Sequence, residues 1–291
     1  MTESAHLRIG ALSRRVGVAP ELLRAWEQRY GLLQPVRSAG GFRLYSTADE
    51  ERVRSMRRHL DAGVSAAQAA RLALTESSRE GTEEAQIAGL VRLSTELRAA
   101  LDRLDEPSAH AMFDRLLAAF TLQTVLRDVV LPYLHELGER WEQGEATVAQ
   151  EHFASNVLRG RLLGLARGWA EGTGPKAVLA CAPGELHDLP LIIFGLVLAG
   201  RGWRITYLGP DTPIATIRDT LTDVEPRLVV IAATTTQRFA AAEPALTELA
   251  RHVRVALAGA GATDGLARAT GASLLEGDPV TAAERVADER R

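Results

Sequence analysis

The segment KAVLACAPGELHDLPLIIFGLVLAGRGWRITYLG, residues 176–209, contains two short apolar runs separated by a loop and an apolar stretch of helix length. The runs, KAVLACA and WRITYLG, contain small and β-branched residues. Continuously apolar runs of this length are typical of strands buried on both faces of a sheet. The segment therefore predicts a strand–helix–strand unit with parallel strands.

Three further runs follow the same pattern downstream. They are RLVVIAAT (227–234), RVALAGA (254–260) and ASLLEG (272–277), and helix-length segments separate them. Strands that alternate with helices predict a parallel sheet covered by helices on both faces. About five such units over residues 174–291 favour a flavodoxin-like, doubly wound domain, in which ligands bind at the carboxyl ends of the strands.

The region upstream of this sheet has helical periodicity throughout. Its apolar positions recur every three or four residues at Leu90, Leu93, Leu97, Leu101 and Leu104. Further helices are predicted over residues 108–120, 122–141 and 148–169. Four helices with short connections indicate a four-helix bundle.

Two polar segments divide the chain. TESSREGT (75–82) and GTGP (172–175) are interpreted as linkers. The predicted domains are therefore 1–76, 83–172 and 174–291.

Composition excludes several classes of protein. The chain has 291 residues, of which 46% are hydrophobic and 24% charged, which is typical of a globular protein. No apolar run is long enough to span a bilayer, and MTESAHLRIG lacks the features of a signal peptide. The single cysteine, Cys181, excludes an intramolecular disulfide and is interpreted as a buried small residue. We expect a cytoplasmic protein without membrane contact.

Charge is distributed unevenly. Residues 1–60 carry eleven arginines against six carboxylates, a net charge of +5, and the total of −3 leaves −8 for the rest of the chain. A basic N-terminal segment on an acidic body indicates phosphate contacts at the N-terminus.

The basic segment has a helix-turn-helix pattern. Helices are predicted over 9–16 and 20–30 around the turn GVAP, with Trp26 in the core. The following GLLQPVRSAGGFRLYS (31–46) predicts a β-hairpin wing. The pattern alone is weak, because many helix pairs share it.

The motifs IGALSRRVGV and LRAWEQRYGLLQPVRSAGGFRLYS, within about 70 residues, resemble the winged helix-turn-helix of MerR-type transcriptional regulators. This resemblance implies binding to double-stranded DNA as a dimer, with helix 20–30 in the major groove and the wing on the flanking backbone. Any single arginine here is also interpretable as a solvated surface residue, so the prediction depends on the group. The candidate contacts are Arg14, Arg24, Tyr30, Arg37, Arg43 and Tyr45.

His187 follows the first predicted strand, where ligand-binding loops belong in a doubly wound sheet. A metal-ligating histidine needs its second nitrogen fixed, and either Glu185 or Asp188 is close enough in sequence to do this. Spacing alone favours an exposed loop histidine instead.

The segment 184–213 resembles the cobalamin-binding loop of B12 proteins and the helix and strand that follow it. This resemblance implies that His187 is the lower ligand of cobalt and that the nucleotide tail of the cofactor enters the sheet. AATTTQ (232–237) and LAGAGA (257–262) match later parts of the family pattern. The family's glycine falls on Pro190, so the loop either keeps its path or reshapes and weakens tail binding. The residues carried over are Glu185, His187, Asp188, Thr234, Thr235, Gly259 and Gly261.

WEQGEATVAQEH (141–152) resembles a signature of light-sensing cobalamin regulators of the CarH and LitR type. The resemblance implies that Trp141 covers the upper face of the corrin and that Glu151 and His152 hydrogen-bond an adenosyl group, with Val148 beside them. The residues alone are also consistent with a core tryptophan and a first-turn acid favoured by the helix dipole. Photoreceptor relatives have a histidine after the tryptophan, and this chain has Glu142, which leaves His152 or His135 as substitutes.

Together these resemblances predict a non-enzymatic transcriptional regulator, a repressor and photoreceptor controlled by adenosylcobalamin and light through a change of oligomeric state. The predicted assembly is a homodimer or a homotetramer. The alternative is a MerR-type regulator of the same fold that responds to a protein partner, a bilin or another tetrapyrrole. A cobalamin enzyme is disfavoured because the chain has no room for a catalytic barrel.

Overall fold

The computed structural model describes residues 6–38 and 40–289, and of Glu80 and Gly81 it describes only the backbone. It divides into two compact units, residues 1–91 and 92–291, which are described separately. Helix α4 (Ala66–Asp102) is shared between them. Within the described residues, no helix is both long enough and apolar enough to cross a membrane.

The first unit is a winged helix-turn-helix, as predicted. α1 and α2 pack around a core that includes Leu12, Trp26 and Met56, so the expected burial of Trp26 is confirmed. β1 and β2 form the antiparallel wing, with Val36 opposite Leu44. The elements are α1 (Ile9–Val16), α2 (Pro20–Tyr30), β1 (Val36–Arg37), β2 (Arg43–Leu44) and α3 (Thr47–Asp61).

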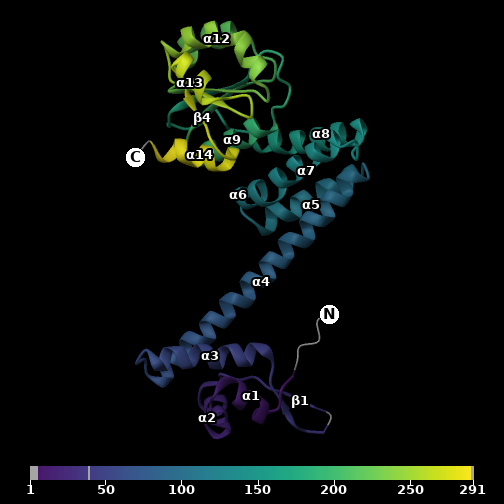
Figure 1. Cartoon of the computed structure of the whole chain (residues 1–291), viewed down its shortest axis with the longest axis vertical. Helices are drawn as coiled ribbons and strands as arrows, with labels where there is room; N and C mark the ends of the chain where they lie inside the picture. The colour runs from purple at the N-terminus through teal and green to yellow at the C-terminus, as the bar shows by residue number, and fades with distance from the viewer. Residues whose placement is uncertain (1–5, 39, 290–291) are drawn as a thin grey trace. The chain divides into compact units, whose positions relative to one another are not determined.

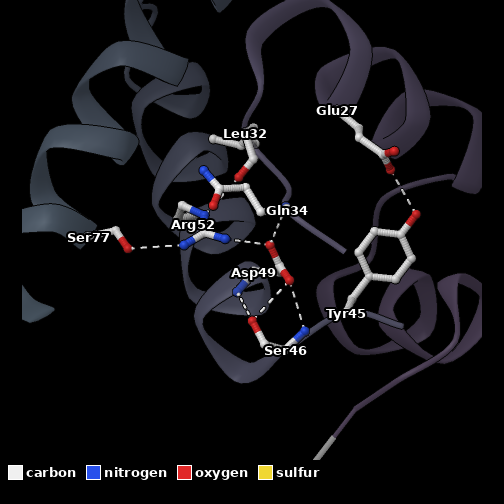
Figure 2. Close-up of polar contacts among 8 residues, drawn as sticks. All are labelled: Glu27, Leu32, Gln34, Tyr45, Ser46, Asp49, Arg52 and Ser77. Atoms are coloured by element: carbon white, nitrogen blue, oxygen red, sulfur yellow. Dashed lines mark hydrogen bonds and ion pairs between the residues drawn. The ribbon is translucent and has the colours of Figure 1, made fainter. Parts of the chain in front are cut away.

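A buried carboxylate, Asp49, joins the loop after α2 to the beginning of α3 (Figure 2). Asp49 is fully buried, and its oxygens accept hydrogen bonds from the backbone N–H groups of Gln34 and Ser46, both at 2.8 Å. Arg52 pairs with Asp49 and donates to the carbonyl of Leu32 at 2.7 Å. The Ser46–Asp49 pair is a capping box that begins α3. Asp49 therefore fixes the loop after α2 to the first turn of α3.

The predicted linker 75–82 is wrong, because these residues lie inside α4. Their hydroxyl groups bond back along the helix: Thr75 donates to the carbonyl of Arg71, Ser78 to Leu74 and Thr82 to Ser78, at 2.8–2.9 Å. Polar side chains that satisfy themselves in this way do not interrupt a helix.

The second unit begins with the helix bundle (Figure 1). The predicted helix 122–141 is present, but its second turn is a π-helix, η1, which ends two residues before Pro132. Proline clashes with the carbonyl four residues earlier in an α-helix, and a π-turn relieves that clash. The bundle helices after α4 are α5 (Glu106–Ala119), α6 (Leu122–Val125), η1 (Leu126–Val130), α7 (Leu131–Glu142) and α8 (Val148–Leu165).

The sheet of this unit has five parallel strands in the order β4-β3-β5-β6-β7. This is the flavodoxin-like order, so the predicted fold is confirmed. α12 and α13 lie on one side of the sheet, and α9 and α14 pack together on the other (Figure 1). α8 of the bundle contacts α9, which brings the bundle to the sheet.

The bounds are β3 (Lys176–Cys181), α9 (Leu189–Gly200), β4 (Arg204–Gly209), α10 (Ile214–Asp219), α11 (Leu221–Val224), β5 (Leu228–Ala232), α12 (Thr236–Ala250), β6 (Val255–Ala258), α13 (Asp264–Thr270), β7 (Ser273–Leu274) and α14 (Pro279–Asp288). Cys181 is fully buried at the end of β3, and burial raises the pKa of its thiol to about 12.

Replacing Asp49 by Ala should lower the free energy of unfolding of the first unit by about 3 kcal/mol, because Arg52 then keeps a half-buried charge without its partner. Chemical denaturation monitored by circular dichroism measures this change. The exposed neighbour Glu51→Ala is the control and should change stability by less than about 0.5 kcal/mol. Equal stability of the two variants would contradict a structural role for Asp49.

Candidate functional site

A cavity of about 680 Å³ lies between the bundle and the carboxyl ends of β3, β4 and β5. α7 and α8 form its bundle side, and the loop before α9 forms much of its sheet side. The structure brings together here, from four separate segments, most of the residues that the sequence predicts for cofactor binding. Those that line the cavity are Trp141, Val148, Glu151, His152, His187, Asp188 and Thr234.

The imidazole of His187 is hydrogen-bonded to the buried carboxylate of Glu185. Glu185 is fully buried, and one of its oxygens, Oε1, lies 2.7 Å from Nδ1 and 2.9 Å from the backbone nitrogen of His187. An ionised carboxylate only accepts hydrogen bonds, so in the neutral imidazole the proton is on Nδ1 and the lone pair is on Nε2. The side chain of His187 is 66% exposed and lines the cavity. This arrangement leaves Nε2 available as a metal ligand.

The second oxygen of Glu185, Oε2, is also fully engaged. It accepts from the backbone N–H and the hydroxyl of Thr234, both at 2.6 Å, and pairs with Arg238. Burial alone raises the pKa of Glu185, but the hydrogen bonds from Thr234, His187 and Arg238 outweigh it and hold this pKa well below its usual range. Glu185 is therefore an anion at neutral pH. Sequence reasoning missed Arg238, which lies outside the matched motifs.

Asp188 has a different role from Glu185. Its buried carboxylate accepts from Nε of Arg159 on α8 at 2.7 Å and from the hydroxyl of Tyr207 on β4 at 2.5 Å. Burial and this hydrogen bond raise the pKa of Tyr207 above its usual range. Of the two carboxylates that the sequence left open for His187, the structure thus selects Glu185. Asp188 joins the bundle to the sheet.

Large apolar side chains stand exposed around the cavity. Trp141 is 51% exposed, Val148 56% and Leu186 68%, and all three line it. Trp141 is therefore not an ordinary core residue, which was the alternative interpretation. Leu186, between the two residues of the Glu185–His187 pair, was missed by the sequence analysis. Exposed apolar surface of this kind marks a ligand-binding site.

The first turn of α8 supplies the polar groups on the bundle side. Thr147 and Gln150 form a capping box that begins this helix. Glu151 accepts from the hydroxyl of Ser155 at 2.7 Å, and His152 is 3.5 Å from Glu151 and 70% exposed. Photoreceptor relatives have a histidine at the position of Glu142, and His152 and His135 are the two candidates to take its role. Of these, His152 lines the cavity. His135 does not line it, and instead lies 3.3 Å from Glu139.

A second cavity of about 170 Å³ adjoins the first and shares His187, Pro190 and Thr234 with it. Gly259 lines this smaller cavity and has a φ of +87°, and a Cβ there would lie 2.5 Å from the carbonyl oxygen of Ala233. A Cβ on Gly261 would lie 2.4 Å from the carbonyl oxygen of Thr235. Both predicted glycines are therefore required by close backbone approach.

Pro190 lies in the first turn of α9, where a missing N–H costs nothing, and the loop keeps His187 at the cavity. Thr235 is the N-cap residue of α12, is exposed and lines neither cavity. Gly261 also lines neither cavity. It lies in the loop after β6, where its backbone N–H donates to the carbonyl of Ala233.

Comparison with known proteins matches all three parts of the chain. Residues 7–75 match the family described as MerR HTH family regulatory protein, and residues 93–163 and 175–283 match two families described as B12 binding domain. The chain is 34% identical to the HTH-type transcriptional repressor CarH of Myxococcus xanthus over 252 residues, 83% of each protein. It is 33% identical to CarA of the same organism over 77% of this chain and 75% of the relative.

The chain belongs to the CarH and CarA family of MerR-type regulators with B12-binding domains. Among solved structures, a monomethylamine corrinoid protein of Methanosarcina barkeri has a TM-score of 0.55 at 18% identity. It covers 66% of this chain and 96% of that one, which supports the fold of the second unit.

The predicted DNA contacts lie on α1, α2 and the wing. Arg14, Arg24, Arg37 and Arg43 are exposed, and Tyr30 is half-buried under the guanidinium of Arg29 at 5.6 Å. Arg43 is 3.0 Å from Glu27 of α2, an ion pair that braces the wing against that helix.

Tyr45 is the exception among the predicted contacts. Its side chain is fully buried, and its hydroxyl donates to Glu27 at 2.9 Å (Figure 2). Burial and this contact raise the pKa of Tyr45 to about 12. A hydroxyl buried in this way is not available to a phosphate, so the predicted DNA contact is wrong for Tyr45.

Replacing Tyr207 by Phe should lower the free energy of unfolding of the second unit by about 1.5–3 kcal/mol, because Asp188 loses a charge-assisted hydrogen bond. Denaturation followed by tryptophan fluorescence measures the change. The half-buried Tyr30→Phe, which removes a hydroxyl from the first unit, is the matched control. An unchanged midpoint for Tyr207→Phe would show that the hydrogen bond from Tyr207 to Asp188 does not stabilise the second unit.

Proposed function

We propose that this protein is a transcriptional repressor that holds adenosylcobalamin between the bundle and the sheet, with His187 as the lower ligand of cobalt. The observation that carries the proposal is the His187–Glu185 pair. It presents a lone pair on Nε2 to a cavity whose far side is lined by Trp141. A neutral imidazole with its other nitrogen on a carboxylate is a standard axial donor set.

The remaining residues fit the cofactor's other parts. Trp141, Val148 and Leu186 supply apolar surface for the faces of a corrin ring. Glu151 and His152 supply polar groups on the upper side for an adenosyl group. The smaller cavity between α9, β5 and β6, bounded by Gly259, lies behind His187 where a nucleotide tail would enter. When bound, adenosylcobalamin supplies a Co–C bond that light cleaves.

In this proposal, light and cofactor act on DNA binding by changing the oligomeric state, and the assembled form is a homodimer or a homotetramer. A ligand shifts such an equilibrium only when it binds one assembly more tightly than the other. Glu142 stands where photoreceptor relatives have a histidine, and its side chain is exposed and does not line the cavity. This replacement favours the alternative of a different signal, including a protein partner or a bilin.

Purified protein mixed with adenosylcobalamin in the dark should bind it, elute as a larger species and bind operator DNA, and green light should reverse these changes. His187→Ala should weaken cobalamin binding about 10–100-fold. Absorption spectra, elution volume and DNA binding measure the three responses. The exposed His252→Ala is the matched control.

Two results would contradict the proposal in different ways. An unchanged spectrum and elution volume after illumination would rule out light sensing but leave B12 binding intact. Wild-type DNA binding by His187→Ala, with and without cobalamin, would favour the regulator that uses another signal.

On the DNA side, we propose that Arg14, Arg24, Tyr30, Arg37 and Arg43 contact the operator. Arg24→Ala should reduce the slope of log K against log salt by about 0.9 for each phosphate contact that is lost. Fluorescence anisotropy at several salt concentrations measures the slope. Arg71→Ala, exposed on α4, should leave it unchanged. A slope equal to that of the wild type for Arg24→Ala would show that Arg24 makes no phosphate contact.

A further inference from the structure

Arg238 occupies a special place beneath the cavity. It lies in the first turn of α12, pairs with Oε2 of Glu185 and donates to the hydroxyl of Thr234 at 3.1 Å. Its side chain is 29% exposed and does not line the cavity. Arg238 therefore acts on the cavity through Glu185 and Thr234.

The charge of Glu185 needs a partner. This carboxylate is fully buried, and a buried charge without an opposite charge is strongly unfavourable. The other arginine at the site, Arg159, is engaged by Asp188. Among the ion pairs of the described residues, Arg238 is the cation with a permanent charge that contacts Glu185.

The two carboxylate oxygens of Glu185 have different partners. Thr234 and Arg238 hold Oε2, whereas Oε1 receives both donors of His187. Fixing Oε2 from two directions sets the plane of the carboxylate. Nδ1 of His187 is hydrogen-bonded to Oε1, so the plane of the carboxylate determines the orientation of the imidazole ring. The ring orientation in turn determines the direction in which Nε2 points.

We propose that Arg238 is a positioning residue for the cobalt ligand: it anchors Glu185 so that His187 presents Nε2 to the cavity. This inference rests on the proposed role of His187. It predicts that Arg238 is needed for histidine coordination although it does not touch the cofactor. Arg238→Met removes the charge and the donor to Thr234, so Glu185 gains freedom to turn.

The test uses the full chain labelled with ¹⁵N-histidine and loaded with cob(II)alamin. Electron paramagnetic resonance then separates a histidine ligand, whose ¹⁵N splits the signal into doublets, from the cofactor's own ¹⁴N base, which gives triplets. Wild type should give doublets. Arg238→Met should lose most of the doublet signal and bind cobalamin about tenfold or more weakly. Arg238→Lys, which keeps the charge, should recover part of both.

Arg251→Met is the matched control, because Arg251 is the C-cap residue of the same helix and its guanidinium pairs with exposed Glu248. It should behave as wild type. If Arg238→Met does not fold, Arg238→Gln, which keeps a donor for Thr234 without the charge, is scored in the same way.

A second measurement needs no cofactor. Long-range ¹H–¹⁵N spectra should give a wild-type His187 ring with the proton on Nδ1, and a ring that exchanges between tautomers in Arg238→Met. Wild-type spectra and affinity for Arg238→Met would overturn the proposal. Absence of doublets in the wild type itself would instead refute the proposed ligand role of His187.

Discussion

The second unit depends on one buried anion. Glu185 lies in the loop after β3, and its donors come from that loop, from Thr234 two residues after β5 and from α12. A carboxylate buried without these donors would be strongly disfavoured, so the fold and the charge require each other. The loops at this edge of the sheet are consequently fixed before any ligand is present, and a preorganised site binds without first ordering its groups.

The neighbouring carboxylate, Asp188, extends the same logic to the bundle. Its pairing with Arg159 and Tyr207 ties α8 to β4 directly beside the residue that faces the cavity. Two acids three positions apart thus have separate tasks, one inside the sheet domain and one between the sheet and the bundle. Each is specified by its donors, which come from distant parts of the chain.

Sequence reasoning predicted the sheet, the bundle and the wing because each depends on local sequence patterns. These are the apolar runs of the strands, the three- and four-residue periodicity of the helices and the turn residues of the wing. Sequence reasoning placed His187, Trp141, Glu151 and His152 through the resemblance to cobalamin-binding families, because spacing alone favoured an exposed loop histidine at position 187. It could not choose between Glu185 and Asp188, since the choice depends on Thr234, Arg159 and Arg238, which converge only in the folded chain. The same limit explains the errors at Tyr45, whose partner Glu27 is on another element, and at residues 75–82, whose polar groups bond within α4.

The two sides of the cavity differ in what holds them. Hydrogen bonds and ion pairs fix the sheet side around Glu185, whereas the bundle side presents Trp141 and Val148 half-exposed to water. Covering that apolar surface with a ligand contributes about 25 cal/mol for each Å² removed from water. Since the sheet side is already ordered, this gain arises mainly where the ligand meets the bundle. Any state of the protein that moves α7 or α8 away from the sheet loses it, and a ligand in the cavity therefore favours the closed arrangement of bundle on sheet.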